Sequence, residues 1–264
     1  MSKLKKLKNI LSRMQSVLVA YSGGGDSTFL LKTASLVLPP DKILAVTAVS
    51  ATYPHQELVF SRKMAKAFGL RHRIIKTREL KDKRFVANPQ NRCYFCKKEL
   101  FTRLAKIARK EKINFVLDAS NVSDEKDFRP GSKARQELGV RSPLKEAGFT
   151  KEDIRKTSKE MGLISWDKPA LACLASRIPY EIKISNNILE RINKAENFLK
   201  TLKLKQVRLR HYNGLCRIEV LQVDIPRLMS KRNLIVERLK NLGYNYITLD
   251  LEGYRTGSLN EILK

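Results

Sequence analysis

A chain of 264 residues, 42% of them hydrophobic, is long enough to bury a real core in one large domain and one small one. Lysine and arginine number 53 against 26 aspartate and glutamate, and the formal net charge of +27 favours phosphate-bearing partners. Four unevenly spaced cysteines do not make a secreted disulfide scaffold, and no apolar run has the length of a membrane span or of a signal-peptide core. We therefore expect a cytoplasmic, soluble protein with no membrane partner.

The first elements of the chain predict a phosphate-binding turn. Residues 3–15 alternate leucine or isoleucine with lysine, as in an amphipathic helix. Val17–Ala20 is apolar and rich in valine, which predicts a buried parallel strand. Ser22-Gly-Gly-Gly-Asp-Ser27 follows, and a helical pattern then runs from Thr28 to Leu38. Glycines let backbone N–H groups approach a ligand, and a helix N-terminus attracts anions.

The glycine-rich loop (residues Ser22–Ser27) differs from two common nucleotide motifs. The loop with Gly-Lys-Ser/Thr has a lysine before its hydroxyl residue, whereas here Asp26 precedes Ser27. The glycines are also not spaced as they are in dinucleotide-binding turns. Its order resembles the PP-loop of ATP pyrophosphatases, which cleave ATP between the α and β phosphates and hold the departing pyrophosphate. The resemblance implies that Ser22, Gly23, Gly24, Gly25, Asp26 and Ser27 bind ATP. The alternative is a turn that binds nothing.

Further strands and helices alternate along the next 140 residues. We expect strands at 43–49, 73–75, 115–117 and 140–143, helices at 54–68, 91–107 and 150–161, and a surface loop at 76–90. This alternation predicts an α/β fold with a parallel sheet and helices on both faces. Because ligands gather at the carboxyl ends of parallel strands, Ser22–Ser27, Ala48–Tyr53 and Ala119–Asp127 are expected to meet at one site.

The remainder of the chain predicts a second, smaller domain. We assign residues 1–165 to the α/β domain, 166–184 to an irregular connection with two prolines, and 185–264 to a small α+β domain. Its expected elements are a helix at 187–202, a hairpin of strands 206–211 and 215–221 around Asn213-Gly214, a helix at 224–240 and a strand at 246–251.

Three cysteines are candidates for chemistry. Cys93 and Cys96 lie at the start of a predicted helix, where the dipole favours thiolates, and Cys173 is a plausible third ligand. A redox pair, a four-ligand zinc site and simple packing remain alternatives. Three thiolates would leave one iron of a four-iron cluster open to an exogenous ligand such as sulfide. Cys216 lies in a predicted strand and is expected to be an ordinary core cysteine.

Three arginines are candidates for phosphate binding. Arg177 follows Cys173 closely, and Arg208 and Arg210 alternate along one strand and so face the same side. Arginine binds phosphate bidentately. The alternative is a solvated strand face.

Over nearly the whole chain, from about residue 10 to 250, the sequence resembles the LarE family of ATP-dependent sulfur transferases, which help to build the nickel-pincer nucleotide cofactor. The segments that carry the resemblance are Ser22–Ser27, Asn91-Arg-Cys-Tyr-Phe-Cys-Lys97, Asp118-Ala-Ser-Asn121, Asp127-Phe-Arg-Pro-Gly131, Arg141-Ser-Pro-Leu144, Lys168-Pro-Ala-Leu-Ala-Cys-Leu-Ala-Ser-Arg177 and Val207-Arg-Leu-Arg-His211. Two positions depart from the family pattern: Glu181 stands where glycine is expected, and Gly25 replaces the commoner valine.

The resemblance implies a reaction and its residues. ATP adenylates a carboxylate of pyridinium-3,5-biscarboxylic acid mononucleotide, and sulfur then converts the activated carbon to a thiocarboxylate. Asp26 would act through Mg²⁺, and Cys173 would attack the acyl adenylate or hold a cluster. The substrate phosphate would bind Ser176, Arg177, Arg208 and Arg210. The resemblance also implies a homo-oligomer.

Members of the family use the cysteine equivalent to Cys173 in two ways. Some have only this cysteine and give up its sulfur, leaving dehydroalanine, whereas others carry the Cys-x-x-Cys pair and resemble enzymes that use a cluster. Cys93 and Cys96 place this chain in the second group. We therefore predict a [4Fe-4S] cluster held by Cys93, Cys96 and Cys173, with a sacrificial Cys173 as the alternative.

Other functions compete with this prediction. A tRNA thiolase would use the strongly basic surface, although the basic residues are spread along the whole chain and no second Cys-x-x-Cys motif is present. A nucleotide-sensing protein would bind ATP without releasing pyrophosphate. An amidating synthetase would need an ammonia-producing partner domain, of which the sequence shows no sign.

Overall fold

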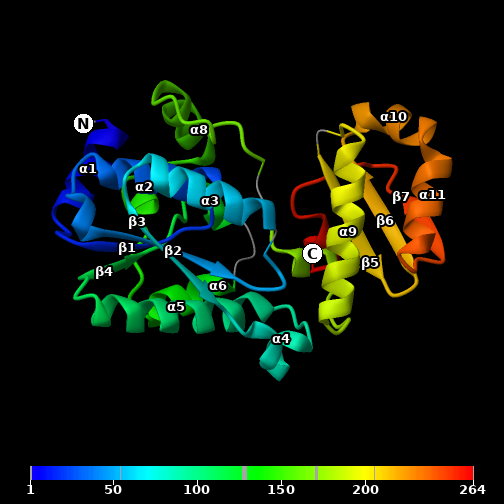
Figure 1. Ribbon diagram of the computed structural model, residues 1–264, viewed down its shortest axis with the longest axis horizontal. Helices are drawn as coiled ribbons and strands as arrows, with labels where there is room; N and C mark the ends of the chain where they lie inside the picture. Colours follow the sequence, from blue (N-terminus) through cyan, green and yellow to red (C-terminus); the bar gives the residue numbers. More distant parts are fainter. Residues whose placement is uncertain (1, 54, 127–129, 170–171, 205, 264) are drawn as a thin grey trace. The chain divides into compact units, whose positions relative to one another are not determined.

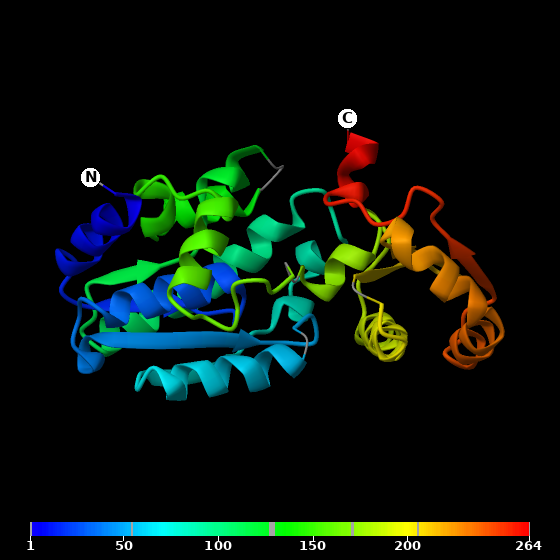
Figure 2. The ribbon, with the colours of Figure 1, turned by 90° about the horizontal axis from the view of Figure 1, so that it is seen from above.

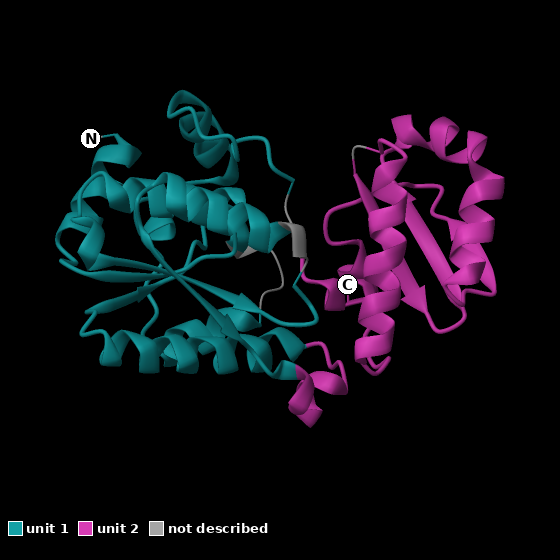
Figure 3. Ribbon diagram, in the orientation of Figure 1, with its two compact units in different colours: residues 1–79, 91–171 teal, residues 80–90, 172–264 magenta. Residues whose placement is uncertain are grey.

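The computed structural model describes residues 2–53, 55–126, 130–169, 172–204 and 206–263, and it divides the chain into two compact units (Figure 3). Unit 1 consists of residues 1–79 and 91–171, and unit 2 of residues 80–90 and 172–264. The predicted segments 127–129 and 170–171, parts of two of the motifs, lie outside the described residues. The domain limits that the sequence predicts, at residues 165 and 185, stay a prediction.

Unit 1 is an α/β layer structure (Figure 1). Its elements are α1 (Lys3–Ser12), β1 (Val17–Ala20), α2 (Gly25–Ser35), η1 (Pro40–Lys42), β2 (Ile43–Val49), α3 (His55–Ala67), β3 (Arg71–Lys76), α5 (Arg92–Lys110), β4 (Phe115–Leu117), η3 (Val122–Lys126), α6 (Gly131–Glu137), α7 (Pro143–Glu146) and α8 (Lys151–Glu160). Among the described residues its strands form one parallel sheet in the order β3-β2-β1-β4, which confirms the predicted fold class.

The central strand β1 is buried on both faces, as its continuous apolar sequence predicts. Val17 and Val19 belong to the core that also contains Phe29 and Leu30 of α2. The alternate residue, Leu18, lies in a second core with Phe101 and Leu104 of α5, on the opposite face of the sheet (Figure 1). Because successive side chains of a strand point to opposite faces, β1 packs its side chains against both helical layers.

The glycine-rich loop lies where the order of the strands reverses. From β1 the chain continues to β2 on one side, and it later returns to place β4 on the other side of β1. Such a switch point leaves a crevice beyond the carboxyl ends of the strands. The loop leaves β1 at this position and leads directly into α2.

Two predictions for unit 1 and its boundary are wrong. Residues 140–143 make only a single bridge, between Arg141 and Leu117, and Pro143 begins α7 because proline has no N–H for a ladder. The expected loop 76–90 contains two helical turns, η2 (Glu79–Lys81) and α4 (Lys83–Val86). Asn88 anchors the end of this segment by donating to the carbonyls of Pro179 (2.6 Å) and Ile182 (2.9 Å) in unit 2.

Unit 2 is built on a three-stranded sheet. Its elements are α4, η4 (Leu174–Arg177), α9 (Asn186–Thr201), β5 (Val207–Tyr212), β6 (Leu215–Val220), η5 (Gln222–Asp224), α10 (Ile225–Ser230), α11 (Arg232–Asn241), β7 (Tyr246–Leu249) and η6 (Ser258–Leu263). The strands lie in the order β5-β6-β7, and α9 and α11 are seen end-on beside the sheet in Figure 2. The predicted hairpin is confirmed, whereas the helix expected at 224–240 is two helices separated at Lys231.

The family pattern has a glycine at the position of Glu181, and Glu181 adopts a backbone conformation that glycine takes most easily. Its φ is 70°, in the left-handed region that costs a residue with a Cβ roughly 1–2 kcal/mol. Its N–H donates to the carbonyl of Asn88 (3.0 Å), which holds the turn in place.

Of the helices in the described part of the chain, none is both long enough and apolar enough to cross a bilayer.

Candidate active site

The glycine-rich loop is shaped by contacts that only glycine permits. Gly23 has a φ of 70°, and a Cβ on it would lie 3.1 Å from the carbonyl oxygen of Glu57. The hydroxyl of Ser27 donates to the carbonyl of Gly24 (3.1 Å) and lies 3.1 Å from the hydroxyl of Ser22. The loop therefore enters α2 in a fixed conformation, and the first-turn N–H groups of α2 have no acceptor within the helix.

Three strand ends meet at this loop, as the sequence predicts. The hydroxyl of Tyr53, beyond β2, donates to the carbonyl of Ser22 (2.9 Å). The amide of Asn121, beyond β4, donates to the Asp26 carboxylate (3.1 Å). Burial, followed by the Glu57 carboxylate, raises the pKa of Tyr53, so this phenol remains a hydrogen-bond donor at neutral pH.

Asp26 has a second partner that the sequence did not reveal. The ammonium of Lys151 forms an ion pair with one Asp26 oxygen, and Asn121 holds the other. Lys151 is the first residue of α8, immediately after Thr150, whose side chain caps that helix. The capping pattern located the helix, but nothing in the sequence indicated that its first turn reaches Asp26, 125 residues away.

Lys168 contacts the glycine-rich loop at the carbonyl of Gly23. Its ammonium donates to the carbonyl of Gly23 (2.9 Å) and to the Glu57 carboxylate (2.7 Å), and lies 3.6 Å from the centre of the Phe60 ring. The side chains of Lys168 and Glu57 are only 16% and 9% exposed, so this ion pair is largely removed from water. In the sequence Lys168 is the first residue of the motif that ends at Arg177, and only the tertiary structure brings it into contact with the loop.

A buried carboxylate lies beyond the carboxyl end of β2. Glu79 is 3% exposed, and one of its oxygens accepts hydrogen bonds from Ser50 and from Thr52 (2.9 Å). The other oxygen has no hydrogen-bond partner among the described residues. Sequence reasoning missed this residue because it lies in a segment predicted to be a surface loop.

The residues predicted to hold Mg²⁺ and a cluster can be compared with the ligands that each group requires. Mg²⁺ is commonly held by one or two carboxylates together with substrate phosphates, and Asp26 beside the glycine-rich loop provides such a carboxylate. Within either unit, the described residues include no group of three or more histidine, cysteine or acidic side chains placed to hold a metal. Mg²⁺ binding at Asp26 and cluster binding by the three cysteines stay predictions.

The predicted cluster ligands lie in different units. Cys93 is exposed and Cys96 half-buried near the start of α5, in unit 1. Cys173 is exposed and immediately precedes η4 in unit 2. Cys216 is fully buried in β6, as predicted for a core cysteine.

We expect the four thiols to differ in reactivity. Burial raises the pKa of Cys216 to about 12, so its thiol is neutral and shielded at pH 7. In the native protein, iodoacetamide should label Cys93 and Cys173, whereas Cys216 should react only after unfolding. Peptide mass mapping with and without denaturant measures this difference. Native labelling of Cys216 at the rate of Cys173 would contradict the burial.

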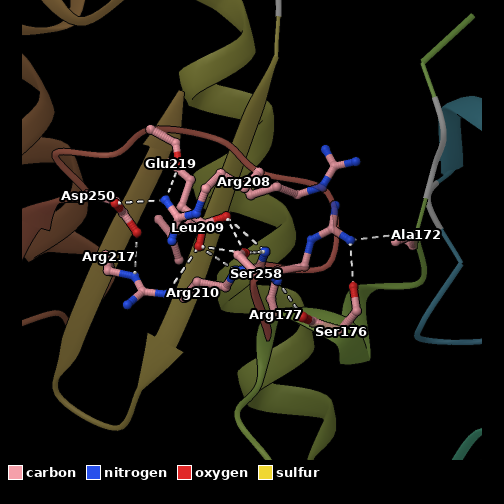
Figure 4. Close-up of polar contacts among 12 residues, drawn as sticks. Ala172, Ser176, Arg177, Arg208, Leu209, Arg210, Arg217, Glu219, Asp250 and Ser258 are labelled. Atoms are coloured by element: carbon pink, nitrogen blue, oxygen red, sulfur yellow. Dashed lines mark hydrogen bonds and ion pairs between the residues drawn. The ribbon is translucent and has the colours of Figure 1, made fainter. Parts of the chain in front are cut away.

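The predicted phosphate-binding arginines form a largely buried cluster in unit 2 (Figure 4). Arg177 makes two contacts with Glu196 (2.8 and 2.9 Å), and Arg210 makes two with Glu219 (both 2.8 Å). Arg210 also donates to the carbonyl of Ser176 (2.7 Å) and Arg177 donates to the hydroxyl of Ser176 (3.0 Å), so these contacts join three of the four predicted residues.

The fourth member of the set, Arg208, lies 5.4 Å from the centre of the Tyr254 ring. Burial and the neighbouring charge of Arg177 lower its pKa, so an additional anion near these guanidinium groups would be stabilised. The role of this cluster in substrate binding stays a prediction.

Breaking the Arg177–Glu196 pair should destabilise unit 2. Both side chains are 2% exposed, and the Arg177 and Arg208 charges keep the pKa of Glu196 below its usual value although burial alone would raise it. Glu196→Gln leaves a buried guanidinium without its counter-charge and should cost about 3–5 kcal/mol of unfolding free energy. Denaturant unfolding measures the loss, and exposed Glu190→Gln on the same helix is the control. Equal stability of the two variants would contradict the prediction.

Comparison with known proteins finds similarity along essentially the whole chain. No protein-family model matches it. The chain is 36% identical to the pyridinium-3,5-bisthiocarboxylic acid mononucleotide synthase of Lactiplantibacillus plantarum over 96% of this chain and 92% of that protein. It is 41% identical to an uncharacterised Synechocystis protein, covering 99% of this chain and 98% of that one. A Methanocaldococcus jannaschii protein, also uncharacterised, is 29% identical over 97% of this chain and 98% of its own length.

Proposed function

The chain belongs to the LarE family, and we propose from that premise that it converts a carboxylate of pyridinium-3,5-biscarboxylic acid mononucleotide to a thiocarboxylate in an ATP-dependent reaction. It is an enzyme, a sulfur transferase with a small nucleotide-like substrate. The similarity to the Lactiplantibacillus synthase, which extends over nearly the whole of both chains, carries this proposal. The geometry of the glycine-rich loop supports its ATP-dependent half.

In the first step, a substrate carboxylate oxygen attacks the α-phosphorus of ATP, and pyrophosphate leaves. The N-terminus of α2 and the hydroxyls of Ser22 and Ser27 would bind the departing phosphates. Asp26 would hold Mg²⁺, which neutralises charge developing on the phosphate oxygens. The acyl adenylate that forms carries AMP as a good leaving group.

Lys151 would change partners as ATP binds. In the structure its ammonium neutralises Asp26. The Lys151 ammonium would turn from Asp26 toward the phosphates of ATP, and the Asp26 carboxylate would then hold Mg²⁺, which would supply the positive charge that Lys151 had supplied. The site would therefore remain neutralised both before and after ATP binds.

In the second step, sulfur replaces AMP on the activated acyl carbon. A [4Fe-4S] cluster held by Cys93, Cys96 and Cys173 would supply this sulfur as sulfide. The alternative is direct attack by the Cys173 thiolate, which would form a thioester that must then lose its bond to the cysteine β-carbon. Ser176, Arg177, Arg208 and Arg210 would hold the substrate phosphate, for which the cationic cluster of unit 2 provides the charge.

One incubation tests the proposal directly. Purified protein, reconstituted anaerobically with iron and sulfide, is combined with ATP, Mg²⁺, the pyridinium dicarboxylate and sulfide as the sulfur source, and the products are identified by mass. We expect AMP, pyrophosphate and a thiocarboxylate in equal amounts, with Asp26→Asn as the inactive control. Formation of AMP and pyrophosphate with another carboxylate, but not with this one, would contradict the assigned substrate.

A tRNA thiolase is the second candidate, favoured by the net charge of +27. It would show tRNA-stimulated AMP formation that falls steeply with salt. AMP formation that is indifferent to tRNA would eliminate it.

We further propose a cytoplasmic location and, from the family, a homo-oligomeric assembly, and sedimentation analysis of the purified protein measures the latter.

A further inference from the structure

The turn that carries Cys173 is held by one arginine (Figure 4). The Nη1 atom of Arg177 donates to the carbonyl oxygens of Ala172 (2.8 Å) and Cys173 (3.2 Å). These two carbonyls belong to the peptide groups on either side of the Cys173 Cα atom. Arg177 therefore fixes the backbone of Cys173 from both sides, while the cysteine itself stays exposed.

Further contacts restrain the same turn. Ser176 donates to the Cys173 carbonyl from its N–H (2.9 Å) and from its hydroxyl (2.7 Å), and this hydroxyl accepts from Arg177 (3.0 Å). Leu174 is 3% exposed and Ile178 is fully buried, so η4 and the residue after it are anchored by their apolar side chains. Cys173 is thus an exposed residue at the start of a turn that hydrogen bonds and burial hold in place.

The carboxylate of Glu196, in α9, orients Arg177 itself. Its two oxygens accept from Nε (2.8 Å) and Nη2 (2.9 Å), the bidentate geometry that fixes the plane of a guanidinium. One of these oxygens also accepts from the N–H of Leu209 in β5 (3.1 Å). A continuous series of hydrogen bonds therefore runs from β5 through Glu196 and Arg177 to the backbone of Cys173.

These contacts leave Arg177 poorly placed to bind a substrate directly. All three of its guanidinium nitrogens donate to protein groups, and the residue is 1% exposed. A ligand phosphate would have to replace Glu196 or the Cys173 turn to reach these nitrogens. Arg177 would therefore contribute to phosphate binding through its charge, whereas its hydrogen bonds serve the turn.

We propose that Arg177, held by Glu196, is a positioning residue that fixes the Cys173 thiol for sulfur transfer. The inference rests on the proposed function and adds to it how the thiol is oriented. Whether Cys173 binds a cluster or attacks the activated carbon, its Sγ must lie at a defined position, and small displacements cost large factors in rate. Arginine suits this task because its planar fork reaches the carboxylate on one side and two carbonyls on the other, which the single ammonium of lysine does not.

Arg177→Lys tests the proposal, because it keeps the positive charge and removes the fork. Initial rates of the reconstituted full chain at varied pyridinium dicarboxylate, with ATP, Mg²⁺ and sulfide, give kcat and KM for thiocarboxylate formation, and AMP is measured in parallel. Hydrogen exchange read by mass spectrometry reports on residues 172–178 and, separately, on α9 and β5. Ser176→Ala is a milder second variant, and Arg238→Lys, exposed on α11, is the matched control.

We expect Arg177→Lys to lower kcat for thiocarboxylate formation by about 10-fold or more at a nearly unchanged KM, and Ser176→Ala to lower it several-fold. The first turnover of AMP formation should keep its wild-type rate in both. Residues 172–178 should exchange faster in Arg177→Lys, whereas α9 and β5 keep their protection. Arg238→Lys should match the wild type throughout.

Two kinetic results would overturn the proposal: an unchanged kcat in Arg177→Lys, or a raised KM at wild-type kcat, which would assign Arg177 to substrate binding. Should Arg177→Lys speed exchange throughout unit 2, Ser176→Ala decides, and wild-type kcat in that variant would overturn the proposal. A wild-type protein that forms no thiocarboxylate would contradict the proposed function itself. The exchange of residues 172–178 in Arg177→Lys would then still show whether this arginine holds Cys173.

Discussion

Replacing Lys168 with methionine is expected to raise the KM for ATP by about 10- to 100-fold, with a smaller effect on kcat. The substitution leaves the buried Glu57 carboxylate without its counter-charge, directly behind the Gly23 peptide. An uncompensated buried charge costs about 3–5 kcal/mol, and here part of that cost would appear as repulsion of the phosphates of ATP. Initial rates of AMP formation at varied ATP concentration measure the effect.

A second substitution separates electrostatics from packing. In the double variant Lys168→Met with Glu57→Gln the negative charge is gone, and we expect the KM to return to within several-fold of the wild-type value. Lys66→Met on the outer side of α3 is the control, because this exposed lysine has no contact with the loop. A double variant as impaired as the single one would show that Lys168 acts only through its hydrogen bond to Gly23.

Replacing Cys173 with serine is expected to reduce thiocarboxylate formation by about 10³-fold or more, because both proposed routes need its thiolate. Formation of AMP and pyrophosphate should persist in this variant, since the residues that contact the glycine-rich loop are intact. Cys216→Ala is the matched control, and it should retain sulfur transfer because the buried thiol of Cys216 takes no part in the reaction.

Cys93→Ser and Cys96→Ser distinguish the two sulfur sources. If a cluster supplies the sulfide, each variant loses sulfur transfer together with the iron and sulfide bound after anaerobic reconstitution. If Cys173 is consumed, both variants keep a single turnover, and the protein loses the elements of H₂S at Cys173. The mass of the wild-type protein after turnover, measured beside its iron content, decides between these outcomes.

The sequence by itself determined the layers of unit 1 and the position of the glycine-rich loop. The continuous apolar sequence of Val17–Ala20 and the Thr150 cap are local signals, and local signals depend only on neighbouring residues. The same rules were less successful at 76–90, where the side chain of Asn88 binds carbonyls about 90 residues further along the chain.

Only the tertiary structure identified the partners of the candidate site residues. Lys151 and Lys168 reach the glycine-rich loop from 125 and 145 residues away, and the sequence gives no local signal for either contact. The sequence also does not identify the carboxylates that pair with Arg177 and Arg210, because a buried charge pairs with whichever opposite charge lies close to it in the folded chain. The sequence motifs therefore identified the candidate site residues. The ion-pair partners of these residues depend on contacts that form only when distant segments pack together.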